Sequence, residues 1–278
     1  MYKDLLLAVD TRDANAICVD YGIKLAKRFD AHLTGLYLIP EFAPPATVGI
    51  YLTTDINANV ERHERQQADA VIAGFRDTAE REGVAFDTRT DRCHRSEFAD
   101  RLAIYGRYAD AVIIGQPDDD DSAGDIQDPG DTLLTCGAPV IVVPHIGAPA
   151  TTAERVMIAW NVSRESARAV RDAMPLLEQA KAVDVVCIRP KMSEAGHGDM
   201  PGTDIALHLA RHGIQVEVEI VESKDIDVGN AILSHLADRG SDILVMGGYG
   251  HSRMREFILG GATRTILQSM TVPVLMAH

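Results

Sequence analysis

The sequence predicts an α/β protein made of two similar, doubly wound domains. Short apolar runs alternate with helical patterns along the chain, and three of these runs recur in the same order in its second half. Apolar runs that are continuous rather than alternating are typical of strands buried on both faces of a parallel sheet. Helices between such strands make right-handed crossovers and cover both faces of the sheet.

The internal repeat is the strongest of these observations. The paired runs are residues 4–10 with 155–161, 109–115 with 241–247, and 138–144 with 272–277. A repeat of this length means that one folding unit is present twice. Residues 146–152 between the copies have the composition of a linker, so we expect domains over residues 1–147 and 152–278.

Helix boundaries in the second half can be read from single residues. Ser163 is placed to cap the start of a helix whose apolar positions recur three and four residues apart. A second helical pattern runs from Asn230 to Arg239 and should stop at Gly240. A third helix is expected over residues 263–269.

Composition and charge exclude several classes of partner. The chain has 278 residues and a formal net charge of −14, which argues against a duplex nucleic acid or an anionic membrane as a partner. No apolar run approaches the roughly 18 residues of a membrane span. The four cysteines show no CxxC spacing, so we expect reduced thiols and a cytoplasmic location. Cys93 and His94 are adjacent but lack zinc-type spacing, so we assign no metal ligand.

A ligand site is expected where the strands of the second half end. In open parallel sheets ligands bind beyond the carboxyl ends of the strands, where the strand order reverses. Residues 247–263, which follow a buried strand, are rich in glycine and arginine. Glycines let backbone N–H groups approach phosphate oxygens, and the start of a helix adds a favourable field. Gly260 and Gly261 come directly before the expected helix. The stretch is neither a Walker A loop nor a GxGxxG motif.

These residues resemble the universal stress protein family. Its nucleotide-binding members carry G-x2-G-x9-G-(S/T) after the fourth strand, and Gly247, Gly250 and Gly260 match that spacing. Gly261 stands where the family has Ser or Thr, which removes a hydroxyl but keeps a backbone N–H. The resemblance covers nearly the whole chain twice. It implies five-stranded parallel sheets of the adenine nucleotide alpha hydrolase-like kind, arranged as a dimer fused into one polypeptide.

The resemblance also implies a ligand and a set of contacts. The ligand would be ATP or AMP, with or without Mg²⁺, and two tandem chains could form a homodimer. Asn161 matches the family's aspartate at the end of the first strand, and Ile188 matches an apolar residue that meets adenine. Together, pattern and resemblance predict a nucleotide site made of Ala159, Asn161, Ile188, Met246, Gly247, Gly250, His251, Arg253, Gly260, Gly261, Ala262 and Thr263.

The first half departs from this pattern. Asp10 matches the strand-end aspartate, but Pro117 follows where a backbone donor is needed, and no second glycine is in register. Residues 118–121 are four successive aspartates, which would repel a polyphosphate. We therefore expect a degenerate partner domain.

Three functions remain open on these grounds. A nucleotide-binding protein of the stress response is the first. The second is a slow ATP hydrolase, for which Glu256 is the only candidate base near the loop, and we assign no catalytic residue. The third is an interaction module with a vestigial nucleotide site.

Overall fold

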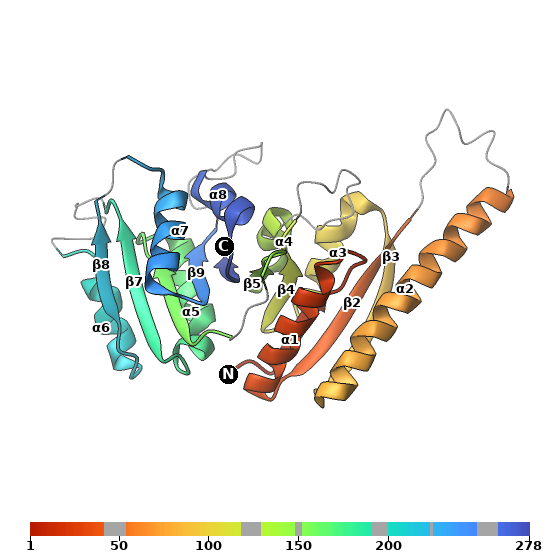
Figure 1. Ribbon diagram of the computed structural model, residues 1–278, viewed down its shortest axis with the longest axis horizontal. Helices are drawn as coiled ribbons and strands as arrows, with labels where there is room; N and C mark the ends of the chain where they lie inside the picture. The colour runs from red at the N-terminus through yellow and green to blue at the C-terminus, as the bar shows by residue number, and fades with distance from the viewer. Residues whose placement is uncertain (42–53, 118–128, 148–151, 191–199, 223–224, 249–260) are drawn as a thin grey trace.

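The computed structural model describes residues 1–41, 54–117, 129–147, 152–190, 200–222, 225–248 and 261–278. Figure 1 shows the two halves side by side. The first half consists of β1 (Asp4–Ala8), α1 (Asn15–Phe29), β2 (His32–Pro40), α2 (Thr54–Glu82), β3 (Phe86–Cys93), the short 3₁₀ helix η1 (Arg95–Glu97), α3 (Phe98–Gly106), β4 (Ala111–Gly115), α4 (Pro129–Cys136) and β5 (Val140–Val143). The second consists of β6 (Arg155–Ala159), α5 (Arg164–Leu177), β7 (Ala182–Ile188), α6 (Thr203–Arg211), β8 (Glu217–Val221), α7 (Val228–Arg239), β9 (Ile243–Gly247), α8 (Gly261–Ser269) and β10 (Val274–Ala277).

All the strands belong to one ten-stranded sheet with the order β3-β2-β1-β4-β5-β10-β9-β6-β7-β8. Within each half the strands are parallel, as predicted. At the centre β5 and β10 pair antiparallel, with Ile141 opposite Leu275. The two predicted five-stranded units are therefore joined edge to edge through their last strands.

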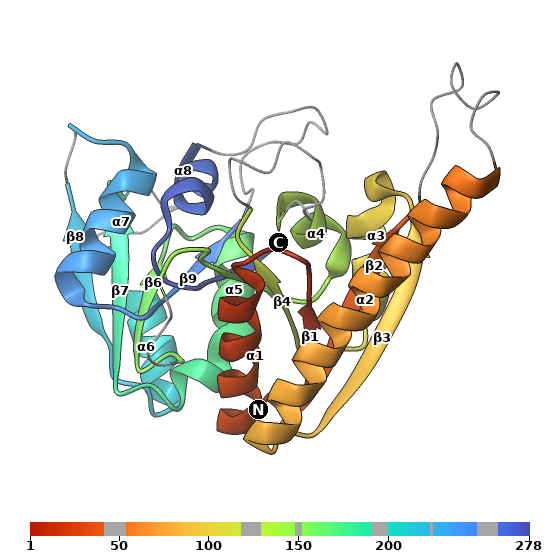
Figure 2. The same cartoon turned by 45° about the vertical axis from the view of Figure 1, so that its right-hand side comes forward.

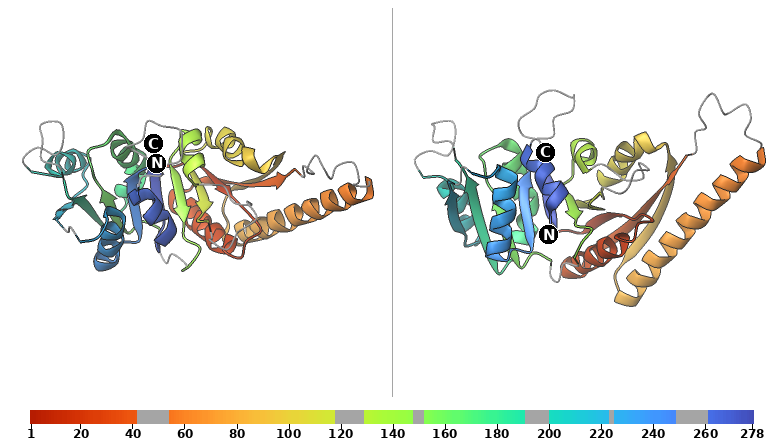
Figure 3. Two further views of the ribbon diagram at one scale, coloured as in Figure 1. Left: turned by 90° about the horizontal axis from the view of Figure 1, so that it is seen from above. Right: turned by 45° about the horizontal axis from the view of Figure 1, so that its top comes forward.

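Alternate residues of the inner strands pack into two apolar cores, one on either face of the sheet. Leu5 and Leu7 lie in one cluster, whereas Leu6 and Ala8 lie in the other. The first cluster includes residues of α1, α2, α5 and α6, and the second includes residues of α3, α4, α7 and α8. Figure 3 shows helices on both sides of the sheet. Both clusters contain residues of both halves, so the halves share their cores.

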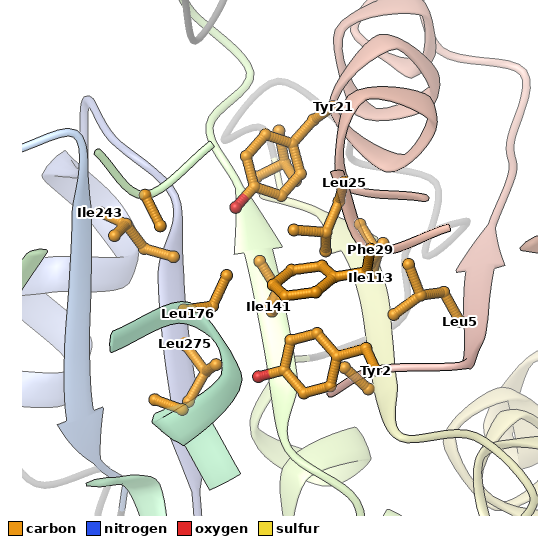
Figure 4. Packing of buried hydrophobic residues seen from close by; sticks show 14 of the residues in the cluster. Tyr2, Leu5, Tyr21, Leu25, Phe29, Ile113, Ile141, Leu176, Ile243 and Leu275 are labelled. Carbon is orange, nitrogen blue, oxygen red and sulfur yellow. The ribbon is translucent and has the colours of Figure 1, made fainter. Parts of the chain in front are cut away.

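The junction between the halves is mainly apolar, and a few hydrogen bonds cross it. Figure 4 shows the hydroxyl groups of Tyr2 and Tyr21 directed toward the second half. The hydroxyl of Tyr2 donates to the backbone carbonyl of Asp172 over 2.7 Å. The guanidinium of Arg28 donates to the side chain and the backbone carbonyl of Gln179 at 3.0 and 2.9 Å. Burial of each large apolar side chain here contributes about 1.5–3 kcal/mol, so the junction adds substantially to the stability of the chain.

The observed helix ends lie within two residues of those predicted from the sequence. Ser163 caps α5, and its hydroxyl accepts a hydrogen bond from the Ser166 N–H at 3.0 Å. Gly240 ends α7 in the left-handed conformation, with φ at 59°. Asp227 caps the start of α7, which begins two residues before the predicted helix. α8 also begins two residues early, so Gly261 is its first residue rather than a residue before it.

Candidate functional site

The strand order of the second half reverses between β6 and β9. From β6 the chain runs outward to β7 and β8, and it then returns to β9 on the other side of β6. Ala159 at the end of β6 pairs in register with Val186 of β7 and with Met246 of β9. The carboxyl ends of β9, β6 and β7 therefore meet at one edge, which is the place where open α/β sheets bind ligands.

The structure brings the described members of the predicted site to this edge. Ala159 and Ile188 are the last residues of β6 and β7, and both are half-buried. Met246 is buried in β9, and Asn161 is exposed beyond the end of β6. Gly247 ends β9, and Gly261, Ala262 and Thr263 form the first turn of α8. Four predicted residues lie outside the described part of the chain: Gly250, His251, Arg253 and Gly260.

Asn161 forms a tight turn between β6 and α5. Its side-chain oxygen accepts a hydrogen bond from the backbone N–H of Ser163 at 3.1 Å. Asparagine favours such turns because its short side chain mimics a backbone group. The turn places Asn161 at the strand end and starts α5 directly after Ser163.

Gly247 lies directly against the first turn of α5. A Cβ atom at this position would lie 2.6 Å from the carbonyl carbon of Glu165 and closer still to the backbone nitrogen of Ser166. Because backbone atoms of a capped helix have little room to shift, only glycine fits here without displacing α5. The first glycine of the motif therefore brings a helix N-terminus, with its anion-favouring field, to the end of β9.

Glu165 is a residue that sequence reasoning missed at this edge. Only 4% of it is exposed. Burial opposes its ionisation, but hydrogen bonds from its own backbone N–H, from Ser163 and from Arg164 outweigh burial and lower its pKa. The ionised carboxylate thus belongs to the cap of α5. An acidic residue in the first turn after a serine cap is the signal that could have identified it.

The position of α8 is set by contacts from both halves. Gly229 of α7 packs against it so closely that a Cβ atom would lie 2.6 Å from the Cβ of Thr265. On the other side, the side-chain amide of Gln116 donates to the Leu267 carbonyl over 2.7 Å. Gly261 is exposed at the helix start, whereas Thr263 is only 4% exposed. The burial of Thr263 counts against a direct phosphate contact through its hydroxyl.

The equivalent edge of the first half is filled by Arg12. Its Nε donates to the Asp10 carboxylate at 2.9 Å, and its Nη1 donates to the Gln116 carbonyl at 2.7 Å. A Cβ atom on Gly115, which corresponds to Gly247, would lie 2.7 Å from Nη2 of Arg12. The Arg12 side chain is 14% exposed. This cation therefore lies over the strand end where Asp10 would otherwise meet a ligand, and the sequence did not indicate it.

Two further predictions concern metals and membranes. Among the described residues, no three His, Cys, Asp or Glu side chains are grouped so that they could hold a metal ion. In the same part of the chain, no helix combines the length and the apolar character needed to cross a membrane. Glu256, the predicted candidate base, lies outside the described residues.

The repeated order of strands and helices, joined across one sheet, defines a tandem α/β protein with two adenine nucleotide alpha hydrolase-like halves. A model of the universal stress protein family matches residues 1–116 and 152–278, so the chain belongs to that family.

Solved structures share the fold of this chain, and one known sequence resembles part of it. A universal stress protein from Archaeoglobus fulgidus has a crystal structure that matches with a TM-score of 0.71 at 16% identity, covering 99% of this chain and 97% of that one. A putative universal stress protein from Pseudomonas aeruginosa matches with a TM-score of 0.57 at 15% identity, over 99% and 92% of the two chains. In sequence, universal stress protein Slr1230 from Synechocystis is 34% identical over 67 residues. That alignment spans 24% of this chain and 22% of the relative.

Proposed function

We propose that this chain binds an adenine nucleotide, ATP or AMP, at the joint edge of β9, β6 and β7, and that it serves the stress response as a nucleotide-dependent regulator. A nucleotide site and a stress role are typical of the family. The observation that carries the proposal is the meeting of three strand ends at the point of reversal, with two helix N-termini beside it.

Each part of the nucleotide has a matching part of this edge. Asn161 lies beyond the central strand, where its amide can bond ribose hydroxyls. The half-buried Ile188 offers an apolar surface and backbone groups for the base. The exposed N-terminus of α8 at Gly261 offers N–H groups for phosphate. The motif glycines Gly250 and Gly260, which lie outside the described residues, would complete the phosphate contacts.

Binding rather than hydrolysis is the function that the described residues support. Hydrolysis requires a group that can take a proton from water and lies within reach of it. Glu165 is the acidic residue we find at the edge, and its oxygens are already occupied by hydrogen bonds that lower its pKa. We therefore expect no phosphate release above background when the purified chain is incubated with ATP and Mg²⁺.

Calorimetry with ATP, AMP and adenosine tests the proposal. We expect one nucleotide per chain. Asn161→Ala should weaken binding about tenfold, because a hydrogen bond to the ribose is lost. Asp10→Asn is the matched control: it changes the equivalent position of the first half and should leave the affinity unchanged.

A second pair of variants tests the loop. Gly250→Val and Gly260→Val should abolish ATP binding, because a branched side chain blocks the close approach of backbone N–H groups to phosphate. No binding by the unaltered chain at millimolar nucleotide would refute the proposal. In that case the chain would be better explained as an interaction module with a vestigial nucleotide site. A stable protein partner recovered with the nucleotide-free chain would support that function.

A further inference from the structure

We propose that the first half acts as a clamp on the nucleotide site of the second half: Leu133 holds Gly248 at the end of β9, Gln116 holds α8, and these two contacts set the affinity for phosphates. This inference rests on the proposed function and adds a regulatory role for the half whose own edge is filled by Arg12. In Figures 1 and 2, α4 and α8 stand on either side of the junction between the halves.

Leu133 of α4 contacts Gly248, the residue that follows the end of β9. It is 4% exposed, and its Cδ2 occupies the space into which a side chain at Gly248 would project. The backbone of Gly248 is fixed as well. Its N–H donates to the Ala277 carbonyl at 3.0 Å, and its carbonyl lies 3.2 Å from Nδ1 of His278. The residue that follows the end of β9 is thus held between the last strand of its own half and a leucine of the other.

Gln116 contacts α8 near the C-terminal end of that helix. It is 2% exposed, and its side-chain amide donates to the Leu267 carbonyl of α8 at 2.7 Å. Its side-chain oxygen accepts the N–H of His145 at 3.1 Å, and its backbone N–H donates to the Val143 carbonyl at 2.7 Å. Both polar ends of the side chain are therefore satisfied, which leaves it one orientation. A shift of α8 would break a buried hydrogen bond, so Gln116 ties this helix to the end of β4.

The two contacts are related by the internal repeat. Gln116 and Gly248 each follow the glycine that ends the fourth strand of their half, and each meets the last helix of the other half. One contact is polar and the other is apolar. Together they hold the end of β9 and helix α8, although neither first-half residue lies at the strand edge of the second half. They are positioning residues, because they act through Gly248 and α8.

Variants with matched controls separate the positioning of Gly248 and α8 from a general loss of structure. Leu133→Ala removes the contact with Gly248, and Leu134→Ala changes the next residue of the same helix, which is 51% exposed. Gln116→Met keeps the volume of the side chain but removes both of its hydrogen bonds, and Gln268→Met makes the same change at an exposed position of α8. We expect Leu133→Ala and Gln116→Met to weaken ATP binding about 5- to 20-fold, the range of ordinary coupling between sites.

Adenosine is the internal reference for these measurements. It lacks phosphates, so its affinity should stay unchanged in all four variants. Equal losses of affinity for ATP and for adenosine would mean that the substitution disturbs the whole site, and this result would overturn the clamp. Unchanged ATP affinity in Leu133→Ala and Gln116→Met would also overturn it and would leave the proposed function standing.

Hydrogen exchange of the nucleotide-free chain tests the clamp independently of binding. Backbone amides of α8 should exchange faster in Leu133→Ala and Gln116→Met than in the two controls, because the helix loses its fixed position. Unchanged exchange in α8 would overturn the clamp and leave the proposed function standing. If the unaltered chain bound no nucleotide, the proposed function would fall, and the clamp, which rests on it, would fall with it.

Discussion

The two halves have the same order of elements and differ at the strand edge where a ligand would bind. In the first half, Arg12 reaches back over Gly115 to the Asp10 carboxylate. In the second, the residue two places after Asn161 is Ser163, which caps a helix that packs on Gly247. One edge is thus filled by a flexible side chain and the other is bordered by a capped helix. The same fold can thus place either an arginine side chain or a capped helix at this strand end, and a few residues after the first strand make the difference.

The two strand-end glycines provide the largest expected difference between the halves. In Gly247→Ala the new methyl group would collide with backbone atoms of α5, so we expect a loss of about 1–3 kcal/mol in the free energy of unfolding. In Gly115→Ala the methyl group would meet only the end of the Arg12 side chain, which can move aside. We expect that variant to lose less than about 0.5 kcal/mol. Urea denaturation of both variants measures the difference, and equal losses would contradict the distinction between the two edges.

Arg12→Ala tests whether the Arg12 side chain, which fills the strand edge of the first half, stabilises the fold. The Asp10 carboxylate is 26% exposed and would lose its charged partner, so we expect a loss of about 1 kcal/mol. Lys181→Ala is the matched control. It also removes an ion pair with an acidic residue, but the Lys181 and Glu154 side chains are 73% and 40% exposed, and we expect almost no loss.

Nucleotide titration of Arg12→Ala sharpens the comparison further. We expect the number of ATP molecules bound per chain to stay at one, because Pro117 and the missing second glycine leave the first half without phosphate donors. A second equivalent of ATP would show instead that Arg12 alone closes this edge.

Local sequence signals predicted much of this structure. The repeat predicted the two units, and Ser163 and Gly240 cap their helices as expected because caps depend on neighbouring residues. The strand ends predicted where Asn161 and Gly247 lie. Their roles as ligand contacts stay predictions.

Contacts between distant segments were not predictable from one sequence. Arg12 and Gln116 are 104 residues apart, and the distance between Gln116 and Leu267 along the chain is 151 residues. No local pattern distinguishes such an arginine or glutamine from a solvated one. The packing of Gly247 against α5 was missed for the same reason, since a glycine after a strand is equally compatible with a turn or a phosphate contact.

The two outer strands, β8 and β3, differ in how their carboxylates are paired, and the effect of this difference on stability should depend on pH. Glu219 of β8 accepts hydrogen bonds from Arg239 at 2.7 and 3.1 Å and pairs with His235 at 2.8 Å. At the opposite edge, Asp91 of β3 accepts a hydrogen bond from Tyr105 at 3.1 Å, and its ion pair with Arg101 is longer, at 3.5 Å. The hydrogen bond from Arg239, followed by that from His235, lowers the pKa of Glu219 below its ordinary value of 4.5. A carboxylate with a lowered pKa in the folded state stabilises the fold above its unfolded pKa, and this contribution disappears as the pH falls through the folded pKa.

We therefore expect Glu219→Gln to cost about 0.5–1 kcal/mol near neutral pH, since the group is partly exposed. The difference from the unaltered chain should shrink as the pH falls below about 4.5, because the glutamate then also becomes neutral. Urea denaturation at a series of pH values measures this. Glu222→Gln, at an exposed position beyond the end of β8, is the control and should follow the unaltered chain at every pH. A cost that stayed constant with pH would mean that Glu219 stabilises β8 through packing or neutral hydrogen bonds, and the charge contrast between the two outer strands would have no energetic consequence.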